Sequence, residues 1–246
     1  MRDLEPGELI RRVTTVARRT SPGAVVDGLR RLEGGVSSLT YAATLTDALG
    51  DRPIVLKVAP PGLAPVRNRN VLRQARVLGG LADLPGFPVP AVLFQDVGEP
   101  PEVPPLFAME LCPGDSYEPM LDVSDSPPAP DVAGERMRVA ARALARLHTV
   151  APRTLGLGDE PVSPVREELD RWARLFATVD PDIGVGHEKL HARLAQRVPE
   201  DIAAQLLHGD YRVANMLFTG PKLEAVIDWE IWSVGDPRSD LAWLLM

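Results

Sequence analysis

Three polar side chains toward the carboxyl-terminal end of the sequence have types and spacings that suit phosphoryl transfer. Asp210 and Asn215 lie in the run HGDYRVAN, and Asp228 follows thirteen residues after Asn215. When a phosphoryl group leaves ATP, one carboxylate takes the proton of the acceptor hydroxyl, while an amide oxygen and a second carboxylate hold Mg²⁺ on the phosphates. We therefore expect Asp210 to act as the base, and Asn215 and Asp228 to bind the metal.

Short apolar runs around this group indicate how it is positioned. Residues 206–207 precede it and residues 216–218 follow it, and both runs are too short for helices but suit buried strands. A further run, residues 223–227, follows a turn and predicts a hairpin that brings Asp228 back beside Asn215. Each polar residue also has an ordinary structural use, since Asp and Asn often bond backbone amides in loops, turns and strand ends.

The motifs around these residues resemble those of a known family. The runs HGDYRVANMLF, VIDWE and GDPRSDLAW closely resemble the aminoglycoside phosphotransferase family, small-molecule kinases with a protein-kinase-like fold. Three earlier runs are similar to the family's nucleotide loop, lysine strand and hinge between lobes: LEGGVSSLTYAATL, IVLKVAP and FAMELCPG. The sequence is closest to the branch whose members are sometimes joined to acyl-CoA dehydrogenases. The resemblance implies that the protein uses ATP and Mg²⁺ to phosphorylate a hydroxyl group of a small molecule.

Two segments of the amino-terminal part are candidates for holding ATP. Gly34 and Gly35 lie between two expected strands, where glycines let backbone amides approach phosphate oxygens, although a Gly-Gly hairpin is also an ordinary turn. Ser37 and Ser38 add hydroxyl donors, and Ser38 stands where the family usually has asparagine. Lys57 lies inside the apolar run IVLKV, where an ammonium group needs a partner. It either grips the α- and β-phosphates or reaches solvent from an edge strand.

The expected partner of that lysine departs from the family pattern. In kinases the lysine is held by a glutamate on the following helix, and alignment of the run VLRQARVL places Gln74 there. An amide oxygen still accepts a hydrogen bond from the ammonium, so we expect weaker positioning of Lys57 rather than its loss. In the hinge, the resemblance implies that adenine binds the backbone of Glu110 and Cys112.

Two residues beside the expected base have roles of their own. Arg212 either reaches the transferring phosphate, as a lysine does in protein kinases, or pairs with Asp228 or Asp236. Both alternatives stay open. His208 is expected to brace the loop by hydrogen bonding, because the resemblance assigns proton transfer to Asp210.

A second motif points to different chemistry. His187 and His191 form the pattern H-E-x-x-H, which binds zinc on a helix of metalloproteases. Catalytic zinc requires a third protein ligand, and the polar residues that follow indicate a solvated helix. A zinc hydrolase is therefore the less favoured alternative.

Composition excludes several classes of protein. The chain has 246 residues, is 45% apolar and carries a net charge of −7, which disfavours a nucleic-acid partner. Cys112 is the only cysteine, so no internal disulfide forms, and a reducing cytoplasm fits. Acidic residues in MRDLEPGELIRR argue against a signal peptide, and no apolar run is long enough to span a bilayer. We expect no membrane location.

The periodicity of apolar residues predicts an α+β, two-lobed fold. An amphipathic helix comes first, and strand-like segments then form a five-stranded antiparallel sheet: residues 25–32, 39–46, 54–58, 91–97 and 106–111. Helices are expected over residues 66–81, 135–150, 164–178 and 186–197, with a loop over 122–131. The expected division is an amino-terminal nucleotide-binding lobe, residues 1–112, and a mostly helical catalytic lobe, residues 113–246.

The last residues suggest that the catalytic lobe is incomplete. Residues 236–246 predict the start of a helix whose end is apolar, without a glycine, a basic last turn or a polar tail. The resemblance implies further helices that wall the acceptor site. We expect this apolar end to mediate self-association.

The sequence therefore predicts an ATP-dependent phosphotransferase that acts on an aminoglycoside-like or other hydroxylated small molecule. A nucleotide-binding pseudokinase without transfer activity is the alternative that Gln74 suggests.

Overall fold

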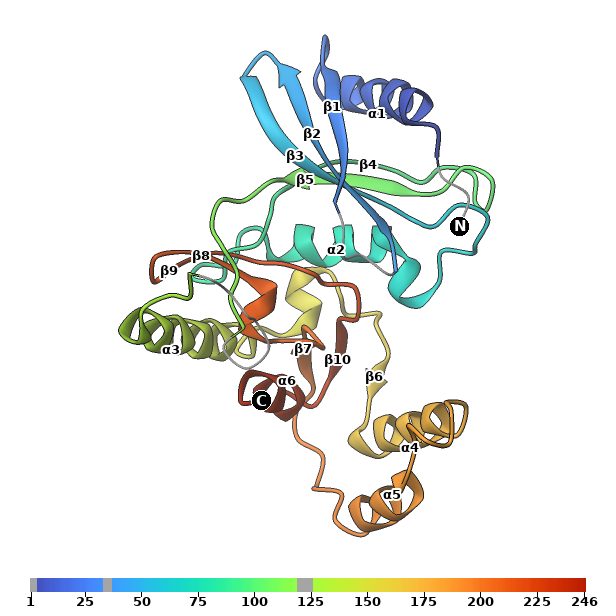
Figure 1. Ribbon diagram of the computed structural model, residues 1–246, viewed down its shortest axis with the longest axis vertical. Helices are drawn as coiled ribbons and strands as arrows, with labels where there is room; N and C mark the ends of the chain where they lie inside the picture. Colours follow the sequence, from blue (N-terminus) through green and yellow to red (C-terminus); the bar gives the residue numbers. More distant parts are fainter. Residues whose placement is uncertain (1–3, 33–36, 119–125) are drawn as a thin grey trace.

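Alternating apolar residues build the sheet that fills the upper half of the molecule (Figure 1). The computed structural model describes residues 4–32, 37–118 and 126–246. Its sheet has the order β1-β2-β3-β5-β4, and all neighbouring strands are antiparallel. The strands are β1 (Val25–Leu32), β2 (Leu39–Asp47), β3 (Gly50–Val58), β4 (Val92–Asp96) and β5 (Leu106–Glu110). The predicted five-stranded sheet is confirmed, although β3 begins at Gly50 rather than residue 54, because it stays paired with β2 as far as the turn.

Helix α1 (Pro6–Thr20) covers one face of this sheet (Figure 1). The helix buries Leu9, Val13 and Val16 in a second core, which alternate residues of β2 and residues of the other strands of the sheet complete. Arg12 lies beside this buried face, and its guanidinium is 2.7 Å from the Asp96 carboxylate at the end of β4. This side chain therefore ties α1 to the edge of the sheet.

Helix α2 (Val71–Leu81) lies on the opposite side of the sheet, above the lower half of the molecule. Asn70 caps the helix, since its side chain accepts a hydrogen bond from the Arg73 amide. The helix therefore begins at Val71 rather than at residue 66, and residues 67–69 form a separate 3₁₀ turn. Apolar side chains of α2 enter the larger core, which also includes residues of the lower half.

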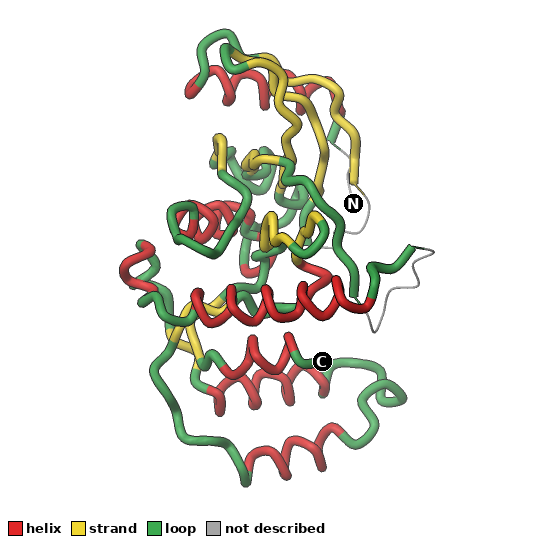
Figure 2. The backbone as a smooth tube through the Cα atoms, turned by 90° about the vertical axis from the view of Figure 1, so that its left-hand side faces the viewer, coloured by secondary structure: helices red, strands yellow, loops and turns green. Residues whose placement is uncertain are grey.

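The lower half combines helices with two small sheets (Figures 1 and 2). Helix α3 (Pro130–Leu147) begins at Pro130, five residues before the predicted start at 135, because proline suits the first turn of a helix. The loop predicted over residues 122–131 therefore ends at residue 129, immediately before α3 begins. Its residues 122–125 lie outside the described residues. The small sheets consist of β6 (Val162–Ser163), β10 (Ser233–Gly235) and β7 (Gln205–Leu207), and of β8 (Met216–Thr219) with β9 (Lys222–Val226).

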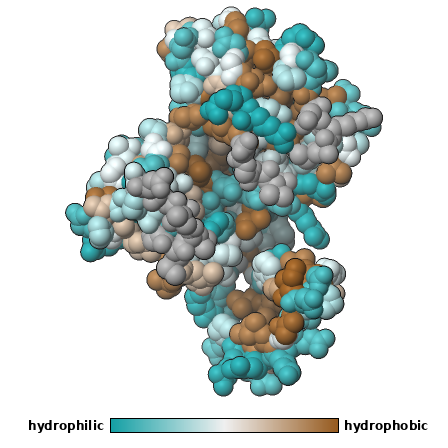
Figure 3. Space-filling model, viewed as in Figure 1, coloured by the Kyte–Doolittle hydropathy of each residue, from teal (hydrophilic) through white to brown (hydrophobic). Residues whose placement is uncertain are grey.

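Helices α4 (Val165–Phe176) and α5 (His187–Ala195) project from the bottom of the molecule (Figures 1 and 2). They pack against each other but bury none of their residues. Several of their apolar side chains are exposed: Trp172, Leu175, Phe176, Leu190 and Leu194. Figure 3 shows a hydrophobic area on this lowest part of the surface. Among the described residues, no helix is both long and apolar enough to cross a membrane.

The last helix, α6 (Arg238–Leu244), lies within the lower half near β7 and β10 (Figure 1). Its Leu244 is buried, whereas Leu241, Leu245 and Met246 are exposed. The predicted helix start after Asp236 is confirmed, and its end is apolar as expected.

Candidate active site

The loop between β7 and β8 is held in place by a buried histidine. His208 accepts a hydrogen bond from the Asp210 amide through Nδ1 (3.2 Å) and donates from Nε2 to the Ile227 carbonyl (2.8 Å). Complete burial lowers the pKa of His208, so the neutral ring with its proton on Nε2 fits both contacts. His208 thus braces the loop by hydrogen bonding, as predicted, and joins it to the strand that precedes Asp228.

A carboxylate from α6 fixes the start of the same loop. Asp240 is fully buried, and its two oxygens accept hydrogen bonds from the backbone amides of His208 (2.8 Å) and Gly209 (2.9 Å). Gly209 has a φ of +88°, and a Cβ there would lie 2.6 Å from the Ile231 carbonyl oxygen, so only glycine fits. Sequence reasoning did not single out Asp240, although the run GDPRSDLAW contains it.

Asn215 lies against the expected base. Its Nδ2 donates to the backbone carbonyl of Asp210 (2.9 Å) and to the Asp210 carboxylate oxygen Oδ2 (2.8 Å). Because both partners are acceptors, the amide orientation is fixed, and Oδ1 of Asn215 remains as a ligand atom for a cation. The spacing of five residues therefore brings together a carboxylate and an amide oxygen, as the sequence predicted.

Arg212 occupies the other oxygen of Asp210. Its Nε lies 3.0 Å from Asp210 Oδ1. Of the two alternatives left open for Arg212, pairing with Asp228 or Asp236 is not found, because Asp228 pairs with Lys57 and Asp236 pairs with Arg238, two residues further on. The guanidinium thus stands directly beside the expected base.

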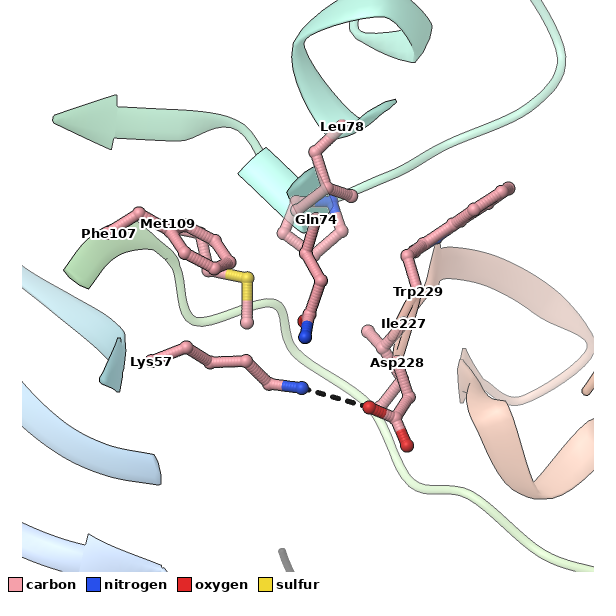
Figure 4. Close-up of a pocket in the computed structure, with 9 residues that line it drawn as sticks. Lys57, Gln74, Leu78, Phe107, Met109, Ile227, Asp228 and Trp229 are labelled. Carbon is pink, nitrogen blue, oxygen red and sulfur yellow. Dashed lines mark hydrogen bonds and ion pairs between the residues drawn. The ribbon is translucent and has the colours of Figure 1, made fainter. Parts of the chain in front are cut away.

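Asp228 reaches the site through the predicted hairpin. The Ile227 amide donates to the Asn215 carbonyl (2.9 Å), which sets the end of β9 beside the start of β8. Asp228 itself has a φ of +66°, a left-handed conformation that turns the chain sharply after the strand. Its side chain is 41% exposed and accepts from Lys57 Nζ at 2.9 Å (Figure 4). Lys57 therefore points into the site rather than to solvent.

Gln74 lies beside this ion pair, where the alignment predicted. Figure 4 shows its amide directed toward Lys57 and Asp228 in a pocket that Met109 and Trp229 also line. Gln74 is only 2% exposed, and its Nε2 is buried without a hydrogen-bond partner. Within the described residues, Lys57 makes its ion pair with Asp228 rather than with a side chain of α2.

The described end of the expected nucleotide loop, residues 37–38, lies near the same place. Gly34 and Gly35 lie outside the described residues, whereas Ser37 and Ser38 are buried at the start of β2. The Ser37 hydroxyl donates to the carboxylate of Glu230, two residues after Asp228. Burial raises the pKa of Glu230 above its usual range. Sequence reasoning did not single out Glu230, although the run VIDWE contains it.

The hinge candidates lie at the end of β5, where Glu110 is the last residue of the strand, and just after it. The Glu110 amide donates to the Ala91 carbonyl (3.0 Å), so an adenine bond to this residue's backbone would use its carbonyl. Cys112 is half-buried, and burial raises the pKa of its thiol, which makes it a poor nucleophile.

The two histidines of the H-E-x-x-H pattern have partners other than a metal. His187 contacts the Gly184 carbonyl (2.8 Å), and His191 lies 2.9 Å from the Asp170 carboxylate. No group of three or more His, Cys, Asp and Glu side chains is placed to hold a metal ion in the described part of the chain. Nothing in this geometry supports a zinc hydrolase.

Sequence relatives of the chain include acyl-CoA dehydrogenases. Over 225 residues, the chain is 28% identical to acyl-CoA dehydrogenase family member 10 of Mus musculus. This match covers 87% of the chain and 20% of the mouse protein. Over 202 residues, the chain is 26% identical to acyl-CoA dehydrogenase family member 11 of Homo sapiens. This match covers 78% of the chain and 25% of the human protein. The chain thus spans about a fifth to a quarter of the length of these relatives.

Solved structures with the same fold include phosphotransferases. A protein from Ralstonia eutropha described as a candidate aminoglycoside phosphotransferase is 22% identical to this chain, with a TM-score of 0.73. The superposition covers 96% of this chain and 69% of the Ralstonia chain. The macrolide 2′-phosphotransferase of Brachybacterium faecium is 24% identical with a TM-score of 0.61, covering 94% and 75%. APH(2″)-IIa, in a ternary complex with streptomycin and ATP, is 19% identical with a TM-score of 0.60, covering 98% and 75%. These likenesses establish the kinase-like fold.

The sequence profile of one family extends over most of the chain. The profile described as the phosphotransferase enzyme family, APH, matches residues 28–246. The match includes the lysine strand, the His208–Asn215 loop and Asp228. The chain therefore belongs to the phosphotransferase enzyme family.

Proposed function

We propose that the protein transfers the γ-phosphate of ATP to a hydroxyl group of a small molecule. In this reaction the acceptor oxygen forms a bond to the γ-phosphorus, the bond from that phosphorus to the β–γ bridging oxygen breaks, and ADP leaves. The hydroxyl proton passes to the carboxylate of Asp210. Bound Mg²⁺ would neutralise the charge that develops on the phosphates.

The observation that carries this proposal is the double hydrogen bond from Asn215 to Asp210. Nδ2 of Asn215 bonds both the carbonyl and the carboxylate of Asp210, at 2.9 and 2.8 Å. This contact holds the Asp210 carboxylate in one orientation and leaves Oδ1 of Asn215 for a hard cation. A positioned base beside a positioned metal ligand is the arrangement that phosphoryl transfer requires.

The donor set fits Mg²⁺, which prefers oxygen ligands from one or two protein groups together with substrate phosphates. Asp228 supplies a partly exposed carboxylate, and Asn215 supplies an amide oxygen. Lys57, 2.9 Å from Asp228, is the cation available to the α- and β-phosphates. Ser37 and Ser38, with Gly34 and Gly35, are the proposed phosphate loop, and the hinge backbone at Glu110 and Cys112 is the proposed adenine site.

Arg212 has a defined place in this proposal. Its Nε lies 3.0 Å from Asp210 Oδ1 and so helps to orient that carboxylate before the acceptor arrives. When the acceptor hydroxyl approaches Asp210, the guanidinium becomes available to the transferring phosphate. We assign Arg212 to that second contact as well.

A nucleotide-binding pseudokinase is the second candidate. Gln74 in place of a carboxylate and the occupied oxygen of Asp210 favour it. We infer that the acceptor is aminoglycoside-like or another hydroxylated metabolite, because the net charge of −7 attracts cations and repels nucleic acid. The single cysteine supports a cytoplasmic location.

The test is an acceptor panel with mass detection. The protein is incubated with Mg-ATP or Mg-GTP and with aminoglycosides, macrolides and hydroxylated acids, singly and pooled. A product heavier by one phosphoryl group supports transfer and identifies the acceptor class. Nucleotide binding without any phosphorylated product favours the pseudokinase.

A further inference from the structure

Helix α2 needs an attachment other than a charged pair with the lysine strand. In protein kinases, an ion pair between the strand lysine and a glutamate of this helix must be in place for activity. Here Gln74 stands at that position, and the described residues pair Lys57 with Asp228 instead. The position of α2 over the site therefore rests on its apolar packing and on polar contacts other than this pair.

Arg73, the residue before Gln74, makes such a contact with Trp232. Its guanidinium stacks on the indole ring, 3.8 Å from the ring centroid, and its Nη1 donates to the Trp232 carbonyl at 2.8 Å. In return, the Trp232 indole Nε1 donates to the Arg73 carbonyl at 3.1 Å. Each residue thus binds the backbone of the other. Trp232 is fully buried, so this contact is shielded from solvent.

A second set of contacts extends the attachment into the lower half. Arg73 Nη2 lies 2.9 Å from the carboxylate of Glu160. One turn further along α2, Arg76 also reaches Glu160 (3.3 Å) and bonds the Gly156 carbonyl (2.6 Å). Glu160 therefore forms ion pairs with both arginines. The Arg76 side chain is more exposed than that of Arg73, 40% against 24%, and it does not contact Trp232.

The two partners of this contact carry site residues next to them. Gln74 follows Arg73 directly and lines the pocket beside Lys57. Trp232 lies four residues after Asp228, in the segment that runs from β9 to β10. A shift of α2 relative to this segment would change the position of Gln74 relative to Asp228.

We propose that Arg73 and Trp232 form a clamp that positions α2 against the Asp228 segment, in place of the missing lysine–glutamate pair. Both are positioning residues, since they act through Gln74, Lys57 and Asp228. The effect on nucleotide binding rests on the function proposed above, whereas the coupling of the two segments does not. The two statements are therefore tested separately.

Amide hydrogen exchange tests the coupling without nucleotide. Arg73→Lys keeps the charge but loses the planar guanidinium that stacks and bonds two partners. Trp232→Phe keeps an aromatic ring but loses the Nε1 donor. Both variants are expected to speed exchange in α2 and in residues 228–235 together. Arg138→Ala, which removes an exposed ion pair with Glu135 on α3, is the control and leaves both segments unchanged. Faster exchange in α2 alone, or in neither segment, overturns the clamp.

A double-mutant cycle with Gln74→Glu tests the replacement. Arg73→Lys is expected to weaken Mg-ATP binding about tenfold in the wild-type background, measured by calorimetry. In the Gln74→Glu background, a new ion pair with Lys57 holds the helix, so Arg73→Lys is expected to weaken Mg-ATP binding clearly less than tenfold. Equal losses in both backgrounds overturn the replacement role. If the wild type does not bind Mg-ATP, the proposed function is contradicted. The hydrogen-exchange experiment then tests by itself whether Arg73 and Trp232 couple the two segments.

Discussion

The ammonium of Lys57 lies 2.9 Å from the carboxylate of Asp228, which follows it by 171 residues. The pair joins the sheet of the upper half to the hairpin of the lower half. A mostly buried ammonium needs such a partner, and the partner is the residue to which we assign metal binding. In the proposed function, Mg-nucleotide would bind between two groups that are paired with each other in its absence, and it would give each of them a new partner.

We predict that Asp228→Ala removes the Mg²⁺ dependence of ATP binding. The substitution deletes the main protein carboxylate for a hard cation held by phosphates. Asn215→Ala, which removes an uncharged ligand, should have the same effect more weakly. Calorimetry with Mg²⁺ and with a chelator measures both. An equal gain in ATP affinity from Mg²⁺ in the wild type and in Asp228→Ala would show that the metal is bound elsewhere.

We predict that Gln74→Glu tightens ATP binding. Gln74 lines the pocket beside Lys57 and leaves its Nε2 without a partner, so a carboxylate there removes an unsatisfied donor and adds a charged partner. A tenfold gain corresponds to about 1.4 kcal/mol. Gln196→Glu, at an exposed position after α5, is the matched control. Weaker ATP binding in Gln74→Glu alone would contradict this account of the lysine's environment.

The buried ring of His208 makes stability depend on pH. Burial lowers the pKa of His208 below the usual 6.5. At a pH between these two pKa values, the imidazole is protonated in the unfolded chain but neutral in the folded protein. This contribution is fully present above pH 6.5 and is lost as pH falls from there toward the folded-state pKa, by at most about 1.4 kcal/mol per pH unit.

Urea denaturation of the wild type and His208→Gln at about pH 7.5 and about pH 5.5 measures this effect. Glutamine keeps one donor and one acceptor but does not titrate. The stability advantage of the wild type over the variant should shrink on acidification. An advantage that grows at the lower pH would mean that His208 is charged in the folded protein.

We propose self-association through the exposed end of α6. Leu245 and Met246 are 73% and 77% exposed, and Leu241 lies on the same helix. The joint substitution Leu245→Gln and Met246→Gln should reduce concentration-dependent association in light scattering. Leu49→Gln, at an equally exposed turn of the sheet, should not. A wild-type chain that stays monomeric at all concentrations contradicts the proposal.

Local sequence patterns predicted the parts of the site that depend on local structure. The short apolar runs before and after the HGDYRVAN loop form β7, β8 and β9, so the hairpin brings Asp228 to Asn215 as expected. The alignment of Gln74 beside Lys57 also agrees with the pocket. The hairpin follows from periodicity and from short separations along the chain, whereas the placement of Gln74 follows from the resemblance to the family.

The relationships that the sequence did not predict join residues from distant segments. Asp240 binds the backbone of the loop from α6, Glu230 meets Ser37 across the site, and Arg73 stacks on Trp232. No periodicity marks such pairs. The ion pair of Arg212 with Asp210, two residues away, was not among the alternatives predicted for Arg212, because only Asp228 and Asp236 were expected as its acidic partners. The strands β6 and β10 are too short to show an alternating pattern.

Transfer of the labelled γ-phosphate to a hydroxylated acceptor tests the central claim most directly. The wild type, Asp210→Asn and the control Asp170→Asn are compared with ATP labelled in its γ-phosphate, and nucleotide binding is measured in parallel. We expect Asp210→Asn to lose roughly 10²- to 10⁴-fold in turnover, because it lacks the base, while it still binds nucleotide. Asp170→Asn should transfer like the wild type. Unchanged turnover in Asp210→Asn would contradict the assignment of Asp210 as the base and the mechanism proposed for this site.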